Sequence, residues 1–194
     1  MQKPGRVVIL NGAPRSGKSS LAHAFQASAP GRWVIWGVDA FNKTLPPSLL
    51  PGIGLRPGGE RPDLEPEVEK LYGVYFAALL AYAETGFDVV ADLGLHSSYS
   101  RPFDPYILMQ QRLAGPRLVV VGVLCPIDVI MARRNADPQG GFYAAGQGVP
   151  APVALWQEAV HAGKTYDLEL DTSVLSPEAG AALIGSRLAA AEID

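Results

Sequence analysis

The sequence predicts an α/β fold, namely a doubly wound, mostly parallel sheet of five strands with helices on both faces. Apolar runs of strand length alternate along the chain with longer segments of helical period, which is typical of this class. Most of these runs are continuously apolar, as expected for parallel strands that helices cover on both sides. With 194 residues, 48% of them hydrophobic, the chain is expected to form a single domain over residues 1–194.

The elements can be placed in order along the chain. The expected strands are residues 6–10, 33–38, 87–93, 118–124 and a weaker run at 166–171. The expected helices are residues 18–27, 67–85, 105–113, 126–134, 152–162 and 177–191. Prolines at the start of several of these segments and glycines just past their ends support the boundaries, because proline fits a first helical turn and glycine a helix terminus.

Two segments do not fit the alternation and are expected to contain no regular helix. Residues 42–66 hold six prolines and four glycines, and residues 137–150 hold four glycines. Long loops inside a compact domain are usually functional. We therefore expect a substrate loop at 42–66 and a lid at 133–150, which includes the end of the preceding helix.

The strongest chemical signal is the pattern GxxxxGK[ST] between the first expected strand and the first expected helix. Glycines there let successive backbone N–H groups converge on a phosphate, and the helix N-terminus adds its positive dipole end. We expect Lys18 to neutralise the β- and γ-phosphates of ATP, and the Ser19 hydroxyl to bind Mg²⁺. The expected nucleotide-binding residues are Gly12, Ala13, Pro14, Arg15, Ser16, Gly17, Lys18, Ser19 and Ser20.

Two aspartates end expected strands beside this loop. Asp39 ends the second run, where its carboxylate could accept the proton of an attacking hydroxyl, or could simply cap a turn. Asp92 ends the third run, where it could hold Mg²⁺ or contact the substrate, or could serve a turn. Both interpretations of each residue stay open at this point.

Arginines are the remaining candidates for phosphate chemistry. Arg133 and Arg134 end an expected helix just before the glycine-rich segment, so either could close over the γ-phosphate and stabilise charge during transfer. Cations are also favoured at helix C-termini by the dipole alone. Arg15 is a further candidate, or a solvated residue of the loop.

Composition excludes several other classes. A net charge of −3 lacks the basic excess that nucleic-acid binding requires, and no apolar stretch is long enough to span a membrane or to form a signal peptide. A single cysteine, Cys125, excludes an internal disulfide framework, so we expect a cytoplasmic protein. His23, His96 and His161 lack ligand-like spacing and are expected to be structural or exposed. Nothing in the sequence indicates the oligomeric state.

Aromatic residues cluster on one face of the long expected helix at 67–85. Tyr72, Tyr75, Phe76 and Leu79 recur at helical spacing. Such a face usually packs into the core, and only sometimes forms a wall of a substrate site.

The chain resembles the chloramphenicol phosphotransferase family of kinases, in which ATP phosphorylates a hydroxyl of the antibiotic. The resemblance rests on the loop at 12–19, the triplet Gly37-Val38-Asp39, the pair Ala91-Asp92, and the C-terminal stretch VHAGKTYDLELDT at 160–172. It implies that Asp39 is the catalytic base, that residues 12–19 bind the nucleotide, and that Asp92 is the second carboxylate at a strand end.

The chain also departs from the family pattern. One carboxylate of the family's acidic pair is replaced by Ala91, and residues 135–141 contain no further arginine where the family has one. The departures fall on the acceptor side. Two alternatives therefore stay beside a chloramphenicol-like acceptor: a kinase for a sugar, nucleoside or activated-sugar metabolite, and an ATP-binding regulatory module.

Overall fold

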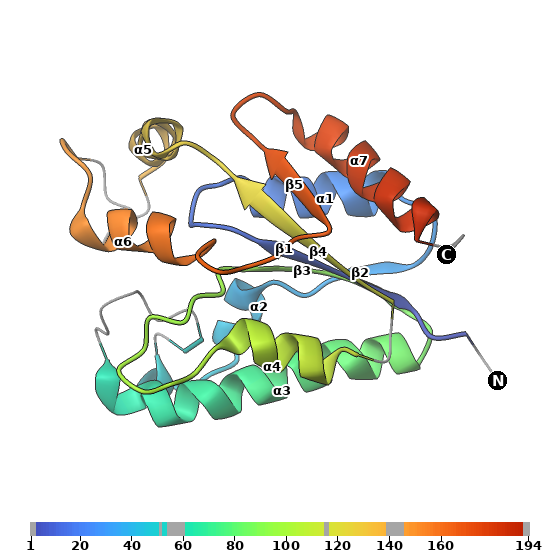
Figure 1. Ribbon diagram of the computed structural model, residues 1–194, viewed down its shortest axis with the longest axis horizontal. Helices are drawn as coiled ribbons and strands as arrows, with labels where there is room; N and C mark the ends of the chain where they lie inside the picture. Colours follow the sequence, from blue (N-terminus) through green and yellow to red (C-terminus); the bar gives the residue numbers. More distant parts are fainter. Residues whose placement is uncertain (1–2, 51, 54–60, 115–116, 139–145, 192–194) are drawn as a thin grey trace.

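A single parallel sheet forms the centre of the computed structural model, which describes residues 3–50, 52–53, 61–114, 117–138 and 146–191. The five strands lie in the order β2-β3-β1-β4-β5, and each described pair is parallel (Figure 1). They are β1 (Arg6–Asn11), β2 (Trp33–Ile35), β3 (Asp88–Leu93), β4 (Arg117–Leu124) and β5 (Leu168–Asp171). The predicted α/β fold with five strands is confirmed.

The predicted helices are also present, with ends that differ from the expected ones by no more than three residues. They are α1 (Lys18–Ser28), α3 (Glu65–Glu84), α4 (Pro105–Arg112), α5 (Ile127–Ala136), α6 (Ala151–Ala159) and α7 (Pro177–Ala190). An additional short helix, α2 (Val38–Asn42), follows β2, and 3₁₀ turns occur at Pro47–Leu49 and Pro62–Leu64.

Each face of the sheet buries its own hydrophobic core. Helices α1 and α7 cover one face, whereas α3 and α4 cover the other (Figure 1). Alternate residues of β1 enter the two cores, Val7 on the α3 side and Val8 on the α1 side, because successive side chains of a strand point to opposite faces. The predicted aromatic face of α3 is fully buried in the first core, so its main role is packing.

The expected strand at 33–38 was too long, which is one correction to the sequence prediction. The strand ends at Ile35, and the chain turns at Gly37 into α2, so Asp39 lies in the first turn of a helix and not at a strand end. The segment 42–66 was also expected to lack regular helix, yet it contains the two 3₁₀ turns and the first residues of α3. Proline at their first positions explains why these turns form.

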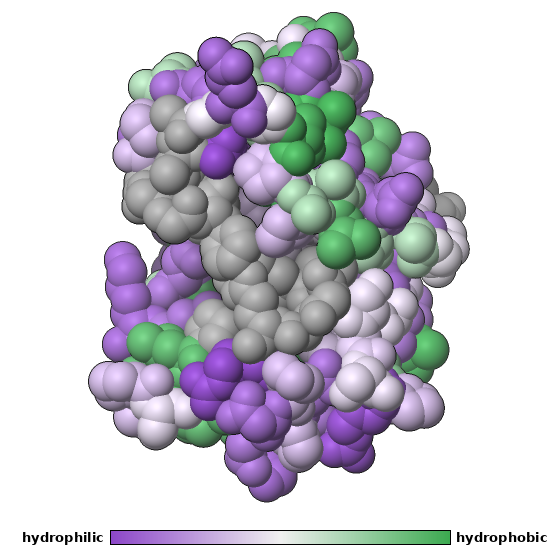
Figure 2. All heavy atoms as spheres, turned by 90° about the vertical axis from the view of Figure 1, so that its left-hand side faces the viewer, coloured by the Kyte–Doolittle hydropathy of each residue, from purple (hydrophilic) through white to green (hydrophobic). Residues whose placement is uncertain are grey.

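The carboxyl ends of the strands meet at one edge of the sheet, next to α5 and α6 (Figure 1). Figure 2 looks onto this side of the molecule, where hydrophilic side chains dominate the upper and lower parts and hydrophobic ones form smaller groups. Within the described residues, no helix is long and apolar enough to cross a membrane. Open parallel sheets bind their ligands at this edge.

Candidate active site

The predicted phosphate loop connects β1 to α1 at the carboxyl edge. Gly17 precedes the first residue of α1 with φ of 91°, a left-handed conformation that a side chain would strain, and Arg15 takes φ of 66°. The loop borders a cavity of about 890 Å³. Seven of its nine predicted residues line this cavity, and the other two, Ala13 and Ser16, are buried.

Lys18 lines the cavity, and its ammonium group is turned toward the loop. Its Nζ donates to the carbonyl oxygen of Ala13 at 2.8 Å. Burial lowers the pKa of Lys18 to about 8, although the nearby carboxylates of Asp92 and Asp39 act to raise it. The predicted lysine and both predicted aspartates therefore share one electrostatic environment.

A hydroxyl and a carboxylate meet where the sequence predicts the metal. The Ser19 hydroxyl donates to Oδ2 of Asp92 at 2.7 Å, and both residues line the cavity. Oxygen ligands of these two types, beside a loop that cradles phosphates, fit Mg²⁺, which usually binds through one or two protein ligands plus phosphate oxygens and water. The residues present fit the expected ion.

Asp39 faces the same cavity from the first turn of α2. The N-cap of this helix is Gly37, so Asp39 lies in its first turn and is not the N-cap residue. Gly37 packs directly on the other carboxylate: a Cβ at this position would lie 2.1 Å from Oδ1 of Asp92. The absence of a side chain at Gly37 therefore lets the β2–α2 turn approach Asp92.

The predicted arginines lie in three different environments. Arg133 lines the cavity, and its guanidinium donates to the carbonyls of Arg15 and Thr172 at 3.2 and 2.6 Å. Arg15 also lines the cavity and forms an ion pair with Asp137 at 2.8 Å. Arg134 is only 6% exposed and is not among the described residues that line the cavity. Arg133 thus braces the phosphate loop against the end of β5.

Thr172, which the residue pattern alone did not single out, completes this brace. Its hydroxyl donates to the carbonyl of Ser16 at 2.6 Å, and its N–H donates to the carbonyl of Leu124 at 3.0 Å. It follows β5 directly and lies within the C-terminal stretch that carries the family resemblance. Part of that stretch therefore fixes the back of the phosphate loop.

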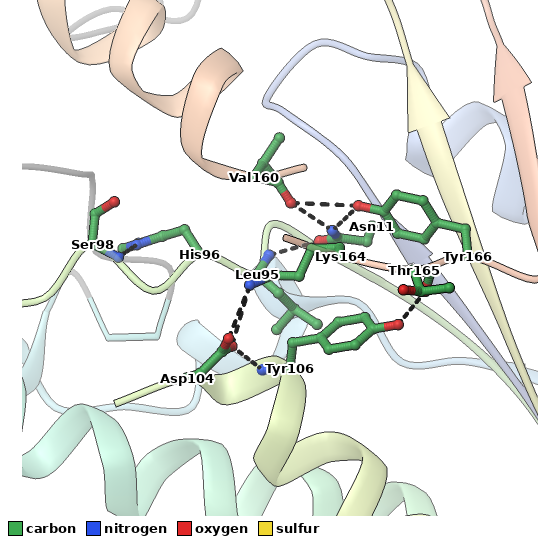
Figure 3. A network of polar contacts seen from close by, with 10 residues as sticks. All are labelled: Asn11, Leu95, His96, Ser98, Asp104, Tyr106, Val160, Lys164, Thr165 and Tyr166. Atoms are coloured by element: carbon green, nitrogen blue, oxygen red, sulfur yellow. Dashed lines mark hydrogen bonds and ion pairs between the residues drawn. The ribbon is translucent and has the colours of Figure 1, made fainter. Parts of the chain in front are cut away.

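The remainder of the C-terminal stretch builds a buried polar network behind the loop (Figure 3). Asn11, the residue before Gly12, is fully buried and donates through Nδ2 to the Val160 carbonyl at 2.9 Å and to the Tyr166 hydroxyl at 2.8 Å. Its Oδ1 accepts from the N–H of Leu95 at 2.7 Å. One amide thereby connects β1 to the loop after β3 and to the end of α6, which keeps the start of the phosphate loop in place.

Two histidines take part in this packing and do not lie in the cavity lining. The Tyr166 hydroxyl lies 2.7 Å from Nδ1 of His161, whose pKa is lowered by burial and by the charge of Lys18. His96 is fully buried, stacks on Tyr99 and accepts at Nδ1 from the N–H of Ser98. The expectation of a structural or exposed position fits both, and His23 is exposed.

Both loops predicted to be functional reach the cavity, but only in part. From the segment 42–66 the cavity is lined by Asn42 and Ile53, and from the segment 133–150 by Arg133, Ala136 and Asp137. Residues 54–60 and 139–145 of these segments lie outside the described residues. Trp156 of α6 lines the cavity as well. Among the described residues its indole N–H has no hydrogen-bond partner, although the side chain is only 7% exposed.

Besides the phosphate loop, two groups of residues line the cavity. The first comes from the β2–α2 turn, the end of β3, Ile53 and α6, through Val38, Asp39, Asn42, Ile53, Asp92, Leu93, Gly94 and Trp156. The second comes from α1, the end of β5 and the start of α7, through Leu21, Leu170, Thr172, Leu175, Ser176, Pro177 and Gly180.

Comparison with known proteins agrees with this geometry. Residues 5–189 match the sequence profile of a family described as chloramphenicol phosphotransferase-like protein. The Mycobacterium tuberculosis protein Rv2636, named as a proposed O-phosphotransferase, is 30% identical over 183 residues, which cover 87% of this chain and 76% of that protein.

Solved structures establish the fold class. An APS kinase of Mycobacterium tuberculosis has a TM-score of 0.66 at 17% identity, covering 96% of this chain and 98% of that one. A sugar kinase from Janibacter sp. has a TM-score of 0.64 at 18% identity, covering 96% and 95%. Shikimate kinase from Aquifex aeolicus has a TM-score of 0.57 at 16% identity, covering 96% and 98%. The fold is that of the phosphate-loop kinases.

The lowered pKa of Lys18 predicts a pH dependence of nucleotide binding. Bound phosphate favours the charged form of Lys18. Above a pH of about 8 the lysine of the free protein is neutral, so nucleotide binding there should be coupled to uptake of one proton. Titration calorimetry should show the affinity for Mg²⁺·ADP falling about tenfold per pH unit above that value. Lys18→Met should bind weakly and without this slope. An equally flat profile for the wild-type protein would contradict the proposed contact.

The same shift predicts an unusual effect on stability without nucleotide. The pKa of Lys18 is lowered from 10.5 to about 8 in the folded protein, so below a pH of about 8 the buried positive charge reduces the free energy of unfolding. Lys18→Met should therefore unfold at the same or a higher temperature than the wild type at neutral pH. Its advantage should shrink as the pH rises from about 8 toward 10.5, and calorimetry across this range measures it.

Replacing Gly37 tests the link between the β2–α2 turn and the metal site. In Gly37→Ala the new methyl group would displace the Asp92 carboxylate from Ser19, so the Mg²⁺ concentration needed for half-maximal nucleotide binding should rise by about tenfold. Gly185→Ala is the matched control, because a Cβ at this helical position meets nothing within 4 Å. An unchanged Mg²⁺ requirement in Gly37→Ala would rule out the link.

Proposed function

The chain belongs to the chloramphenicol phosphotransferase-like family, and on that premise we propose that it transfers the γ-phosphoryl group of ATP to a hydroxyl of a small molecule. Lys18, Asp39 and the hydrogen-bonded pair Ser19 and Asp92 all line the same cavity, and this observation carries the proposal. A binding module alone would not require a carboxylate opposite the phosphate loop.

In this proposal Asp39 is the general base. Its carboxylate accepts the proton of the acceptor hydroxyl as the oxygen attacks the γ-phosphorus in line with the leaving ADP. Lys18 and the backbone N–H groups of the loop stabilise the negative charge on the transferring group. Arg133 is the better placed of the two helix-end arginines to assist, since it lines the cavity and Arg134 does not.

Ser19 and Asp92 would hold Mg²⁺ next to the phosphates. The ion, when bound, supplies positive charge that offsets the charge of the phosphate oxygens. Asp92 then contributes to metal binding, and Asp39, on the neighbouring turn, remains available for the proton.

We place the acceptor in the part of the cavity that Val38, Asp39, Asn42, Ile53, Asp92 and Trp156 line, called the acceptor end, and this part favours an uncharged molecule with an apolar portion. Its described lining carries two carboxylates, and the described cations that line the cavity, Arg15, Lys18 and Arg133, belong to or contact the phosphate loop. A carboxylate or sulfate on the acceptor would be repelled there. Side chains of Val38, Ile53 and Trp156 offer apolar contact, whereas Asn42 is already hydrogen bonded to the backbone of Ile53.

Chloramphenicol is therefore the first acceptor to test. A sugar with many hydroxyls would need several polar partners, and the described acceptor end provides few. Among the described apolar residues of the segments 42–66 and 103–108, Ile53 alone lines the cavity; Phe103 and Leu108 pack against the hydrophobic core on the α3 side of the sheet. We place the reaction in the cytoplasm, where ATP and a reduced Cys125 are expected, with no nucleic acid as partner.

Replacing the proposed base tests this function. Asp39→Asn should lower kcat for acceptor phosphorylation by at least about 100-fold, because general base catalysis contributes on that order, while the affinity for Mg²⁺·ATP stays within about twofold of wild type. ADP release is measured with a panel of hydroxyl compounds that includes chloramphenicol. Asp128→Asn, an exposed carboxylate of α5, serves as the control.

Two results would contradict the proposal. Normal acceptor turnover in Asp39→Asn would remove Asp39 as the base. If no compound accelerated ADP release by the wild-type protein, the alternative of an ATP-binding regulatory module would be favoured instead.

A further inference from the structure

Tyr75 lies in the middle of α3, below the turn that carries Asp39. Its side chain is fully buried, and its hydroxyl donates a hydrogen bond to the backbone carbonyl of Trp36. Its ring meets the ring of Phe41 edge to face, with 5.3 Å between centroids. Trp36 immediately precedes the turn into α2, and Phe41 lies on the buried side of α2, so one side chain contacts both ends of the segment 36–41.

This segment has little to hold it in place by itself. Helix α2 has five residues and no side-chain cap, and helices this short are unstable unless tertiary contacts support them. The N–H of Trp36 donates to the carbonyl of Val90 at 3.0 Å, which fixes the segment to β3. The Trp36 carbonyl is held by α3, because the described donor of its hydrogen bond is the hydroxyl of Tyr75.

The position of this segment matters because it sets the distance between the two carboxylates. Gly37 already lies in van der Waals contact with Asp92, and Asp39 follows two residues later. A small displacement of the Trp36 carbonyl would therefore move Asp39 relative to Asp92 and the phosphate loop. Misplacing a catalytic group by about 1 Å can cost about 100-fold in rate.

We propose that Tyr75 is a positioning residue, whose hydroxyl and ring fix the β2–α2 turn so that Asp39 faces the acceptor hydroxyl. The catalytic meaning of this role rests on the proposed function, in which Asp39 is the base. The mechanical part, that Tyr75 holds α2, stands on the contacts alone.

The surroundings of Tyr75 keep its hydroxyl a hydrogen-bond donor. Burial, followed by the charges of Asp92, Tyr72 and Asp39, raises the pKa of Tyr75 well above its ordinary value of 10.0. The phenol thus stays protonated throughout the working pH range. Tyr75 is not among the described residues that line the cavity, so it is not expected to touch a bound ligand.

Tyr75→Phe is the informative variant, because it removes the hydroxyl and keeps the ring. Tyr72→Phe is the matched control: Tyr72 lies on the same helix and is 1% exposed, and its described ring contacts are with Phe76 and Phe103, which lie outside α2. Both variants remove one buried tyrosine hydroxyl from the same core, so a general loss of stability should affect them alike.

Hydrogen exchange of the purified protein, without any ligand, tests the mechanical part. The amides of Ala40 and Phe41 donate to the Gly37 carbonyl at 3.1 and 3.2 Å, so they report on the first turn of α2. In Tyr75→Phe they should exchange about tenfold faster than in wild type, the effect expected for one buried hydrogen bond. In Tyr72→Phe they should exchange at the wild-type rate. Equal exchange in the two variants would overturn the proposal.

A double-mutant cycle with chloramphenicol as acceptor tests the catalytic part. Tyr75→Phe should lower kcat about tenfold with ADP affinity unchanged, and Tyr72→Phe should stay within about twofold of wild type. Added to Asp39→Asn, the Tyr75→Phe change should cost less than about twofold, because a residue that acts through Asp39 has nothing left to position. An equal loss in both backgrounds would overturn the proposal.

The cycle also separates this proposal from the proposed function. Unimpaired turnover in Asp39→Asn alone would refute the function of Asp39 as the base, and the exchange experiment would still decide whether Tyr75 holds α2. A severe loss in Asp39→Asn together with a wild-type rate in Tyr75→Phe would leave the function intact and refute the positioning role.

Discussion

The hydrogen bond between the Ser19 hydroxyl and the Asp92 carboxylate joins the two halves of the site, and the rest of the arrangement depends on it. It is possible because β1 and β3 are adjacent parallel strands, with Leu10 opposite Asp92, so the phosphate loop and the end of β3 reach the same edge. On one side of this bond lie Lys18 and the phosphate loop, where we propose that the nucleotide binds. On the other side, Gly37 brings the β2–α2 turn, and with it Asp39, against Asp92.

The site is built at some cost to the stability of the free protein. Lys18 is held where burial opposes its charge, and the indole N–H of Trp156 is buried without a partner among the described residues. Such costs are common where groups are held ready for a ligand, and the surrounding structure must offset them. Here the Asn11 network behind the loop and the Arg133–Thr172 brace beside it keep the loop in place.

Much of the fold was predictable from sequence because its signals are local. Continuous apolar runs predicted the strands, and the glycine and lysine spacing of the phosphate loop predicted the residues around the cavity. Where the prediction was wrong, a distant contact decides the structure. The run at 33–38 has strand composition, yet the strand ends at Ile35. The carbonyl of the next residue, Trp36, accepts a hydrogen bond from Tyr75, which is 39 residues away in the sequence, and the chain then turns into α2.

The placement of the arginines and of Trp156 could not have come from local patterns either. Sequence suggested two arginines free to close over a phosphate, whereas Arg133 is hydrogen bonded to the loop and to Thr172, and Arg134 lies away from the described lining. Trp156 looks like a core residue in its helical context and is indeed buried, but α6 crosses the carboxyl edge of the sheet and brings it to the cavity.

Whether this cavity brings a triphosphate and an acceptor hydroxyl together can be decided by following the γ-phosphoryl group of ATP. The wild-type protein is incubated with Mg²⁺, ATP labelled in the γ-phosphate, and chloramphenicol or another uncharged alcohol, and the products are separated and weighed by mass spectrometry. The label should appear in the organic acceptor, with one ADP formed for each phosphoryl group transferred. Recovery of all the label as inorganic phosphate, with every alcohol tested, would rule out phosphoryl transfer to an alcohol.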